Sequence, residues 1–323
     1  MINLGNILVT GGAGYIGSEV AARLIDRGDN VIIVDNLSTG DVRRVPASAI
    51  FFQADFCDSE VISKIFTDFR ISSVLHFAAL KQARESAHYP ELYWRNNVQD
   101  LVRFLDIVKG YEFQNLILSS SCSVYGNSGI VNATTPLKPV SPYGWTKLVS
   151  EQVCADFAAK FSWNFVALRY FNVIGASSRP FAGDYSSNCL LPTLFRRHIA
   201  EEDFLILGRD FPTPDGTAIR DYIDVRDVAS AHITALEMSE SGFFGTLNVS
   251  SGKPSSVAEI LEKFSEVSTE MLRISIGEVN LADPAEVWGE PSLELLSAGW
   301  TAKMRIEDTI LDHWNSFQRY SYM

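Results

Sequence analysis

Tyr143 and Lys147 are the residues of this sequence whose types and spacing point most directly to proton chemistry. Four residues make about one helical turn, so both side chains lie on one helix face and their polar ends can converge on a single ligand. Pro142 suits the first turn of such a helix, and Ser141 can cap it. A Tyr-x-x-x-Lys pair is common by chance, so its meaning depends on the elements around it.

A glycine-rich turn near the N-terminus is the strongest local signal. It follows a predicted strand and reads Thr10-Gly11-Gly12-Ala13-Gly14-Tyr15-Ile16-Gly17. Glycines there allow a tight turn, close approach of the backbone to a pyrophosphate and close helix packing, while a helix N-terminus offers free N–H groups. Asp35 ends the second predicted strand, where a carboxylate takes the adenosine ribose hydroxyls and repels a 2′-phosphate. The turn therefore predicts a dinucleotide site that prefers NAD to NADP.

Two positions near Asp35 extend this prediction. Asn36 follows it with no arginine beside it, which agrees with NAD. Asp55 comes at the end of the third predicted strand, from which it can reach the adenine. Its alternative role is that of a helix N-cap or a turn residue.

A cluster of hydroxyl side chains supplies the next part of the argument. The predicted strand Leu116–Ser119 runs directly into Ser120-Ser121-Cys122-Ser123-Val124-Tyr125-Gly126. In open α/β sheets ligands bind beyond the carboxyl ends of the strands, so Ser121 is expected beside the dinucleotide site. Ser/Thr clusters otherwise serve as turns and caps, which is the alternative role of this one.

The elements that position these residues alternate between strand and helix up to about Phe171. Strands are predicted at Ile7–Val9, Val31–Asp35, Ile50–Gln53, Val74–Phe77, Leu116–Ser119 and Phe165–Arg169. Helices are predicted at Tyr15–Arg27, Ser59–Phe69, Leu92–Val108 and Tyr143–Lys160. Such alternation implies βαβ units and a parallel sheet covered on both faces. The predicted fold class is α/β, a doubly wound Rossmann sheet.

After Phe171 the alternation loosens into irregular segments, residues 175–188 and 211–216, that are rich in Gly, Ser and Pro. Long irregular segments in a compact domain are usually functional loops, so we expect them to wall a substrate pocket. We therefore expect an NAD-binding domain over residues 1–171 and a smaller mixed α/β substrate lobe over residues 172–323. Residues 222–236 can return to pack on the first domain.

Composition limits the class of protein. With 323 residues and a formal net charge of −12, the chain lacks the clustered Lys and Arg that nucleic-acid or anionic-membrane partners require. Four scattered cysteines do not match a zinc site or a disulfide scaffold, so we expect free thiols and no metal. No leader and no membrane-spanning run is evident, which favours the cytoplasm.

Together these motifs resemble the extended short-chain dehydrogenase/reductase superfamily. Further runs narrow the resemblance to the UDP-glucose 4-epimerase family over Ile7 to about Trp300, and they are HFAALK at 76–81, NNV at 96–98, RYFN at 169–172 and PTPDGTAIRDY at 212–222. The resemblance implies a homodimeric isomerase that uses NAD and epimerises UDP-glucose and UDP-galactose at C4 through a transient 4-keto sugar.

The resemblance also implies residue roles. Tyr143 is the expected acid/base, Lys147 binds the nicotinamide ribose, and Ser121 hydrogen-bonds the reacting hydroxyl. Tyr143 and Ser121 therefore also count as expected substrate contacts. The expected cofactor contacts, besides Tyr143 and Lys147, are Gly11, Gly14, Tyr15, Ile16, Gly17, Asp35, Asn36, Asp55, Phe56, Phe77, Ala78, Ala79, Lys81, Asn97, Ser119 and Tyr170. The further expected substrate contacts are Ser123, Asn172, Asn188, Cys189, Arg220, Asp283 and Val287.

The phenol of Tyr143 needs help to act as a base at neutral pH. Its ordinary pKa is about 10, so roughly 4 kcal/mol of preferential phenolate stabilisation is required. One positive charge at about 4 Å contributes roughly 4 kcal/mol at an effective dielectric near 20. We expect the Lys147 ammonium and the positive nicotinamide ring to supply this stabilisation.

Two positions depart from the family pattern at the substrate diphosphate and sugar. Many members carry an Arg-x-Gly-Asp segment whose Arg grips the diphosphate, and this chain reads Asn280-Leu281-Ala282-Asp283 there. Cys189 stands where an Asn commonly contacts the substrate, with Asn188 beside it. A lost charge-assisted contact weakens binding by roughly 1.5–3 kcal/mol, although Arg220 remains and Arg179 or Arg209 can compensate.

Val287 bears on the size of the sugar. It falls where the family varies between a bulky Tyr and a small residue that admits an N-acetyl group. UDP-N-acetylglucosamine is therefore the second candidate substrate. The alternative is that Val287 merely packs.

Two rival functions share the same fold. A nucleotide-sugar 4,6-dehydratase or decarboxylase needs a carboxylate just after the Ser/Thr cluster, where this chain has Cys122 and Ser123, so elimination is disfavoured. A non-catalytic NAD-binding protein is compatible with the fold alone. In the family's dimers the helices that match Leu92–Val108 and Tyr143–Lys160 pair into a four-helix contact. Their apolar residues can equally be core.

Overall fold

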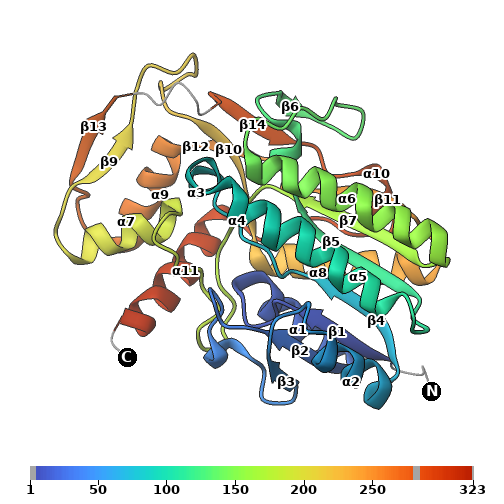
Figure 1. The fold of residues 1–323 in the computed structure, drawn as a ribbon. Coiled ribbons are helices and arrows are strands. Elements are labelled where there is room, and N and C mark those ends of the chain that lie inside the picture. The colour runs from blue at the N-terminus through green and yellow to red at the C-terminus, as the bar shows by residue number, and fades with distance from the viewer. Residues whose placement is uncertain (1–4, 279–283, 322–323) are drawn as a thin grey trace.

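The computed structural model describes residues 5–278 and 284–321. Seven parallel strands form its main sheet, in the order β11-β7-β5-β4-β1-β2-β3 (Figure 1). The strands are β1 (Asn6–Thr10), β2 (Asn30–Asp35), β3 (Ile50–Gln53), β4 (Ile71–His76), β5 (Asn115–Ser121), β7 (Asn164–Tyr170) and β11 (Gly245–Val249). The predicted doubly wound fold is confirmed, and each of the predicted strands is present with shifted ends or, for β3, unchanged.

Helices cover both faces of this sheet because adjacent strand residues point to opposite sides. Ile7 and Val9 pack in one core with helices α1 (Tyr15–Arg27) and α8 (Val225–Glu240). Leu8 packs in a second core on the other face. The helices of that face are α2 (Ser59–Phe69), α5 (Asp100–Val108) and α6 (Pro142–Phe161). The sheet is thus buried on both sides, as an all-parallel sheet requires.

The predicted helix over Leu92–Val108 is interrupted in the structure. It consists of α4 (Pro90–Trp94), a π-helical turn (Arg95–Gln99) and α5. The turn contains Asn97, one of the expected cofactor contacts, and π-helical insertions are frequent at functional sites. Helix α6 begins as expected: Ser141 caps it by accepting a hydrogen bond from the N–H of Gly144 at 3.1 Å.

Most elements after residue 171, together with one strand from before it, form a second lobe. A five-stranded sheet contains β6 (Gly129–Val131), β8 (Asn172–Ile174), β10 (Ile219–Asp224), β12 (Pro254–Ser256) and β14 (Glu286–Gly289). A two-stranded sheet pairs β9 (Phe204–Leu207) with β13 (Ile274–Gly277). Helices α7 (Leu190–Ile199), α9 (Val257–Ser268) and α11 (Ile306–Ser321) share one apolar core with β9. Two further helices are short, α3 (Ala83–His88) and α10 (Leu293–Ser297).

The chain passes between the two lobes more than once, since β6 lies in the second lobe and β11 in the main sheet. Helix α8 packs against α1, β5 and β7, and β11 then pairs with β7 at the edge of the main sheet. Strand β11 was not expected from the sequence. The domain boundary at residue 171 stays a prediction.

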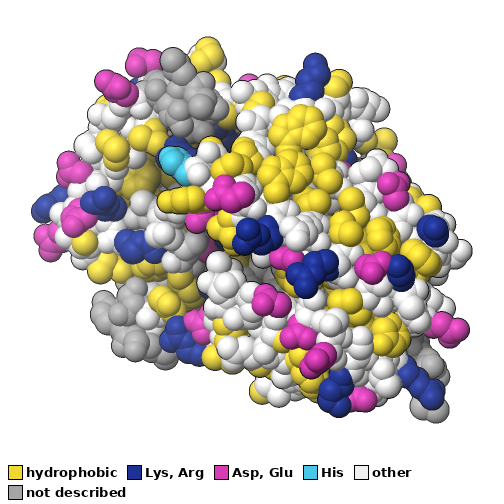
Figure 2. Space-filling model, viewed as in Figure 1, with side chains coloured by type: hydrophobic (Ala, Val, Ile, Leu, Met, Phe, Trp, Pro, Cys, Tyr) yellow, Lys and Arg dark blue, Asp and Glu magenta, His cyan; other side chains and the backbone are white. Residues whose placement is uncertain are grey.

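An apolar patch lies on the surface of α4, α5 and α6, where Figure 2 shows hydrophobic side chains gathered. The residues of this helical patch are Leu92, Trp94, Val102 and Trp145, each between 37% and 46% exposed. By contrast, Tyr93, Leu101 and Leu105 of the same helices are fully or almost fully buried. Within the described residues, no helix is long and apolar enough to cross a membrane.

Candidate functional site

One cavity of about 850 Å³ lies at the carboxyl ends of the main-sheet strands. This is the edge where open α/β sheets bind ligands. Residues from both lobes line it. The predicted site residues that line it are Gly11, Gly14, Tyr15, Ile16, Gly17, Asp35, Asn36, Phe56, Phe77, Ala78, Ala79, Lys81, Ser119, Ser121, Ser123, Tyr143, Lys147, Tyr170, Asn172, Asn188 and Cys189.

The glycine turn forms a backbone cradle on one side of the cavity. Gly11 has φ +71°, and a Cβ there would lie 2.6 Å from the backbone nitrogen of Ala78. A Cβ on Gly17 would collide with the carbonyl oxygen of Gly11. Gly14 caps α1 without a side-chain hydrogen bond, so N–H groups of the first helical turn stay available to a ligand. The cradle suits a pyrophosphate.

Asp35 lies at the end of β2 on the same cavity. Its carboxylate accepts hydrogen bonds from the N–H of Ala13 at 3.0 Å and the N–H of Leu37 at 2.8 Å. Burial raises the pKa of Asp35, and these two hydrogen bonds oppose the rise. Asp55 does not line the cavity, but its carboxylate accepts a hydrogen bond of 2.6 Å from the side-chain amide of Asn36, which does.

Tyr143, Lys147 and Ser121 meet deeper in the cavity. Each is at least 91% buried, and all three line the space beside the cradle. The Lys147 ammonium donates to the carbonyl oxygen of Ser119 at 2.7 Å. The Ser121 hydroxyl donates to that of Ser123 at 3.1 Å. The constellation predicted from spacing is therefore assembled in three dimensions.

The expected stabilisation of the Tyr143 phenolate by Lys147 and the nicotinamide ring stays a prediction, because it belongs to the NAD-bound site. Burial raises the pKa of Tyr143 to about 12, opposed by a hydrogen bond from Ser121 and the charge of Lys81. Lys147 instead holds the carbonyl of Ser119, and burial lowers its own pKa to about 8, opposed by the charge of Glu151. Without its ligands, the site keeps the phenol protonated.

Asn97 does not line the cavity and acts on a segment that does. Its side chain accepts from the N–H of Leu80 at 2.8 Å and donates to the carbonyl of Leu80 at 3.0 Å. It also donates to the hydroxyl of Thr146 at 3.1 Å, on α6. Asn97 therefore ties the cavity-lining residues 77–82 to the helix that carries Tyr143.

The remaining predicted substrate residues are more dispersed. The Arg220 guanidinium donates to the carbonyls of Ile219 at 2.7 Å and Pro284 at 2.8 Å. Val287 is 7% exposed and packs in an apolar cluster with Phe171. Neither of them lines the cavity. Asp283 and the departure at Asn280 lie outside the described residues.

Known proteins match the chain over nearly its whole length. The model of the NAD dependent epimerase/dehydratase family matches residues 7–250. The chain belongs to this family. The rice (Oryza sativa subsp. japonica) protein "UDP-glucose 4-epimerase 2" is 36% identical over 98% of this chain and 82% of the relative. "UDP-glucose 4-epimerase" of Corynebacterium glutamicum is 36% identical over 95% of this chain and 93% of the relative.

Solved epimerase structures share the fold. A UDP-glucose 4-epimerase from Stenotrophomonas maltophila, crystallised with NAD and formylated UDP-arabinopyranose, has a TM-score of 0.92 and 35% identity, covering 98% of this chain and 99% of its own. A UDP-N-acetylglucosamine 4-epimerase from Methanobrevibacter ruminantium M1 has a TM-score of 0.87 and 27% identity, with complete coverage of both chains. The resemblance to UDP-glucose 4-epimerases is confirmed.

Some cavity residues of this epimerase-family chain were missed by reasoning from sequence. Arg44 follows β2, Asp184 and Tyr185 lie in the segment before α7, and His313 and Tyr320 come from α11. The segment 175–188 was expected to wall the pocket, but no motif distinguished Asp184 within it. Nothing near His313 or Tyr320 in the sequence signals a site, because only the fold brings α11 beside the N-terminal half.

Proposed function

We propose that this chain catalyses the NAD-dependent 4-epimerisation of a UDP-hexose, converting UDP-glucose and UDP-galactose into each other through a transient 4-keto sugar. The observation that carries the proposal is the meeting of Tyr143, Lys147 and Ser121 in one cavity with the glycine cradle. A proton-transfer group beside a dinucleotide cradle is what a reversible oxidation of an alcohol requires.

The residues present fit NAD. The cradle at Gly11 leaves backbone room for a pyrophosphate, the first turn of α1 offers N–H groups to it, and Asp35 stands where the adenosine ribose hydroxyls would lie. We assign Lys147 to the hydroxyls of the nicotinamide ribose. NAD, when bound, supplies a hydride acceptor for the C4 hydrogen of the sugar and a positive charge near Tyr143.

In this proposal Tyr143 removes the proton of the C4 hydroxyl and later returns one. The buried phenol resists ionisation, with a pKa of about 12 before ligands bind, so its chemistry depends on the bound state. We assign Ser121 to the reacting hydroxyl, since its own hydroxyl group lines the cavity beside Tyr143 and can rotate toward a sugar.

The residues proposed to contact the substrate differ in how directly they reach the cavity. Asn172, Asn188 and Cys189 are the proposed contacts from the C-terminal lobe, and each lines the cavity. Arg220 and Val287 lie outside that lining, so their proposed roles are indirect. Within the described residues, no cluster of His, Cys, Asp and Glu could hold a metal ion, and the proposed mechanism needs none.

We further propose a homodimer and a cytoplasmic location. The helical patch of Leu92, Trp94, Val102 and Trp145 offers apolar surface on α4, α5 and α6, the helices by which a second copy would pair (Figure 2). All four cysteines are free, which suits a reducing compartment.

The test is incubation of purified protein with UDP-glucose and, separately, with UDP-N-acetylglucosamine, followed by NMR of the anomeric proton. We expect the C4 epimer of UDP-glucose to appear. If only UDP-N-acetylglucosamine yields an epimer, the substrate is a UDP-N-acetylhexosamine and not UDP-glucose. Bound NAD with no epimer from either substrate contradicts the proposal.

A further inference from the structure

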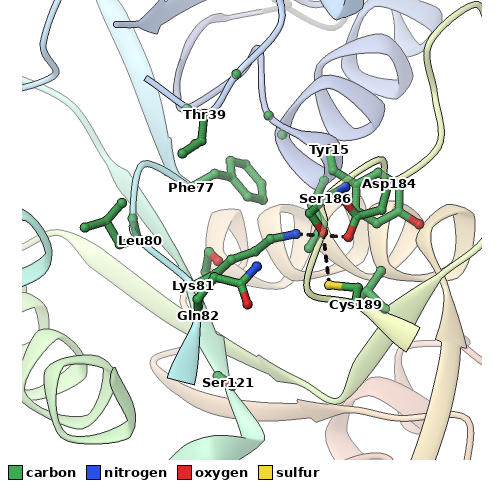
Figure 3. Close-up of a pocket in the computed structure, with 18 of the residues that line it drawn as sticks. Tyr15, Thr39, Phe77, Leu80, Lys81, Gln82, Ser121, Asp184, Ser186 and Cys189 are labelled. Atoms are coloured by element: carbon green, nitrogen blue, oxygen red, sulfur yellow. Dashed lines mark hydrogen bonds and ion pairs between the residues drawn. The ribbon is translucent and has the colours of Figure 1, made fainter. Parts of the chain in front are cut away.

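An ion pair spans the cavity between the two lobes. Lys81, from the segment after β4, donates from its ammonium to a carboxylate oxygen of Asp184 at 3.1 Å. Figure 3 shows the two side chains pointing toward each other, with Tyr15 beside Asp184. The Asp184 side chain is 7% exposed and that of Lys81 is 48% exposed. The carboxylate is buried, whereas the lysine side chain is about half exposed within the cavity lining.

Residues 181–186, which we call the cover segment, contain Asp184 and are held in place by two other parts of the chain. Arg44, just after β2, donates to the carbonyls of Phe181 at 3.0 Å and Gly183 at 2.9 Å. His313 on α11 donates to the carbonyl of Asp184 at 2.9 Å. The N–H of Ser186 donates to the Asp184 carboxylate at 3.0 Å. The carboxylate is therefore anchored on a braced backbone.

Lys81 is the cation of this cavity best placed to meet a ligand. Of the Lys and Arg residues among the described cavity lining, Arg44 is committed to the cover segment and Lys147 to the carbonyl of Ser119. Both are more than 90% buried. A dinucleotide brings two negative charges into a protein of net charge −12, so the direction of this one ammonium matters.

A lysine side chain loses much rotamer freedom when it is held for a ligand. Asp184 removes part of that freedom before binding, because its carboxylate holds the ammonium at 3.1 Å within the cavity lining. Burial would raise the pKa of Asp184, but the charge of Lys81 and the N–H of Ser186 outweigh it and hold the pKa below its ordinary value. The partner therefore stays ionised at neutral pH.

We propose that Asp184 is a positioning residue that acts through Lys81 to retain the dinucleotide, an inference that rests on the proposed function. A charge-assisted hydrogen bond that pre-orders a cation slows the loss of an anionic ligand. The opposite effect, in which Asp184 competes with the phosphates for Lys81, predicts slower release when the carboxylate is removed.

The experiment measures dissociation of NADH from full-length protein by chasing it with excess NAD and following NADH fluorescence. We expect Asp184→Asn to speed dissociation about tenfold, the effect of losing one charge-assisted bond. Lys81→Met should have a similar effect, and the double variant should release NADH no faster than Lys81→Met alone. Asp184→Glu, which keeps the charge, should stay near the unaltered protein.

Asp308→Asn is the matched control, because Asp308 pairs with Arg305 on the surface and does not line the cavity. It should leave dissociation unchanged. Unchanged or slower dissociation in Asp184→Asn overturns the inference, and so do additive effects in the double variant. If the unaltered protein binds no NADH, the proposed function fails as well, whereas tight binding that ignores Asp184 removes only this inference.

Discussion

The two halves of the cavity are built differently. The dinucleotide half consists of the ends of adjacent parallel strands and the helices that follow them, so a short motif places each group. The sugar half draws on residues from separate parts of the chain, such as Asn172 on β8 and Asn188 and Cys189 just before α7. Residues whose role depends on a local motif could therefore be predicted individually from the sequence. Residues that only long-range contacts bring to the site could not.

Of the substitutions that compare the two halves, Tyr143→Phe should have the largest effect on activity. Loss of the acid/base should lower kcat by roughly 10²- to 10⁴-fold while bound NAD is retained, because the change removes one oxygen and no cradle atom. Steady-state kinetics and NAD content measure both quantities. Tyr111→Phe is the control, since that hydroxyl donates to the carbonyl of Ser63 at 3.4 Å and does not line the cavity. Equal activity in both variants would remove Tyr143 from the mechanism.

Gly11→Ala should abolish NAD binding and destabilise the fold by about 2–4 kcal/mol, because it adds both a strained φ and a collision. Gly129→Ala separates the cost of the strained φ from the cost of the collision. Gly129 has φ +69°, close to the +71° of Gly11, but nothing lies within 4 Å of its added Cβ. We expect a loss of only about 1–2 kcal/mol and intact NAD binding there. Denaturant unfolding measures the difference.

Lys147→Met tests whether the buried ammonium in the dinucleotide half lowers the stability of the folded protein. Burial lowers the pKa of Lys147 to about 8, so below that pH the folded protein holds a disfavoured ammonium. The dinucleotide-free variant should be more stable by about 1–3 kcal/mol at pH 7.

The sign of the pH dependence follows from linkage. Between the folded pKa of about 8 and the ordinary value of 10.5, the unfolded chain binds more protons, so the unaltered protein gains stability with rising pH. The advantage of Lys147→Met should therefore shrink over this range in paired unfolding experiments. A gap that widens with pH would contradict the assigned shift.

Val287→Ala should have the smallest effect and concerns the sugar half. Val287 lies in the apolar cluster with Phe171 and outside the cavity lining. We expect a loss of roughly 1–2 kcal/mol of folding stability with KM for UDP-glucose changed less than about twofold. A large change in KM at unchanged stability would return Val287 to the substrate site.

Several features were predictable because local physical chemistry determines them. The ends of α1 and α2 were predicted as they stand, and the Gly11 turn, Tyr143 and Lys147 were correctly brought together. Strand β11 was not, since its pairing with β7 depends on the return of α8 across the sheet. Asp184 was missed because its partner Lys81 is 103 residues away.

The behaviour of the C4 hydrogen tests the central claim most directly. UDP-glucose carrying deuterium at C4 is incubated in ordinary water with the NAD-loaded protein, and the UDP-galactose formed is analysed by NMR and mass spectrometry. We expect deuterium to be retained at C4, because the same hydrogen leaves and returns to the sugar while Tyr143 exchanges only the hydroxyl proton. Loss of the deuterium to water, or bound NAD without any UDP-galactose, would contradict it.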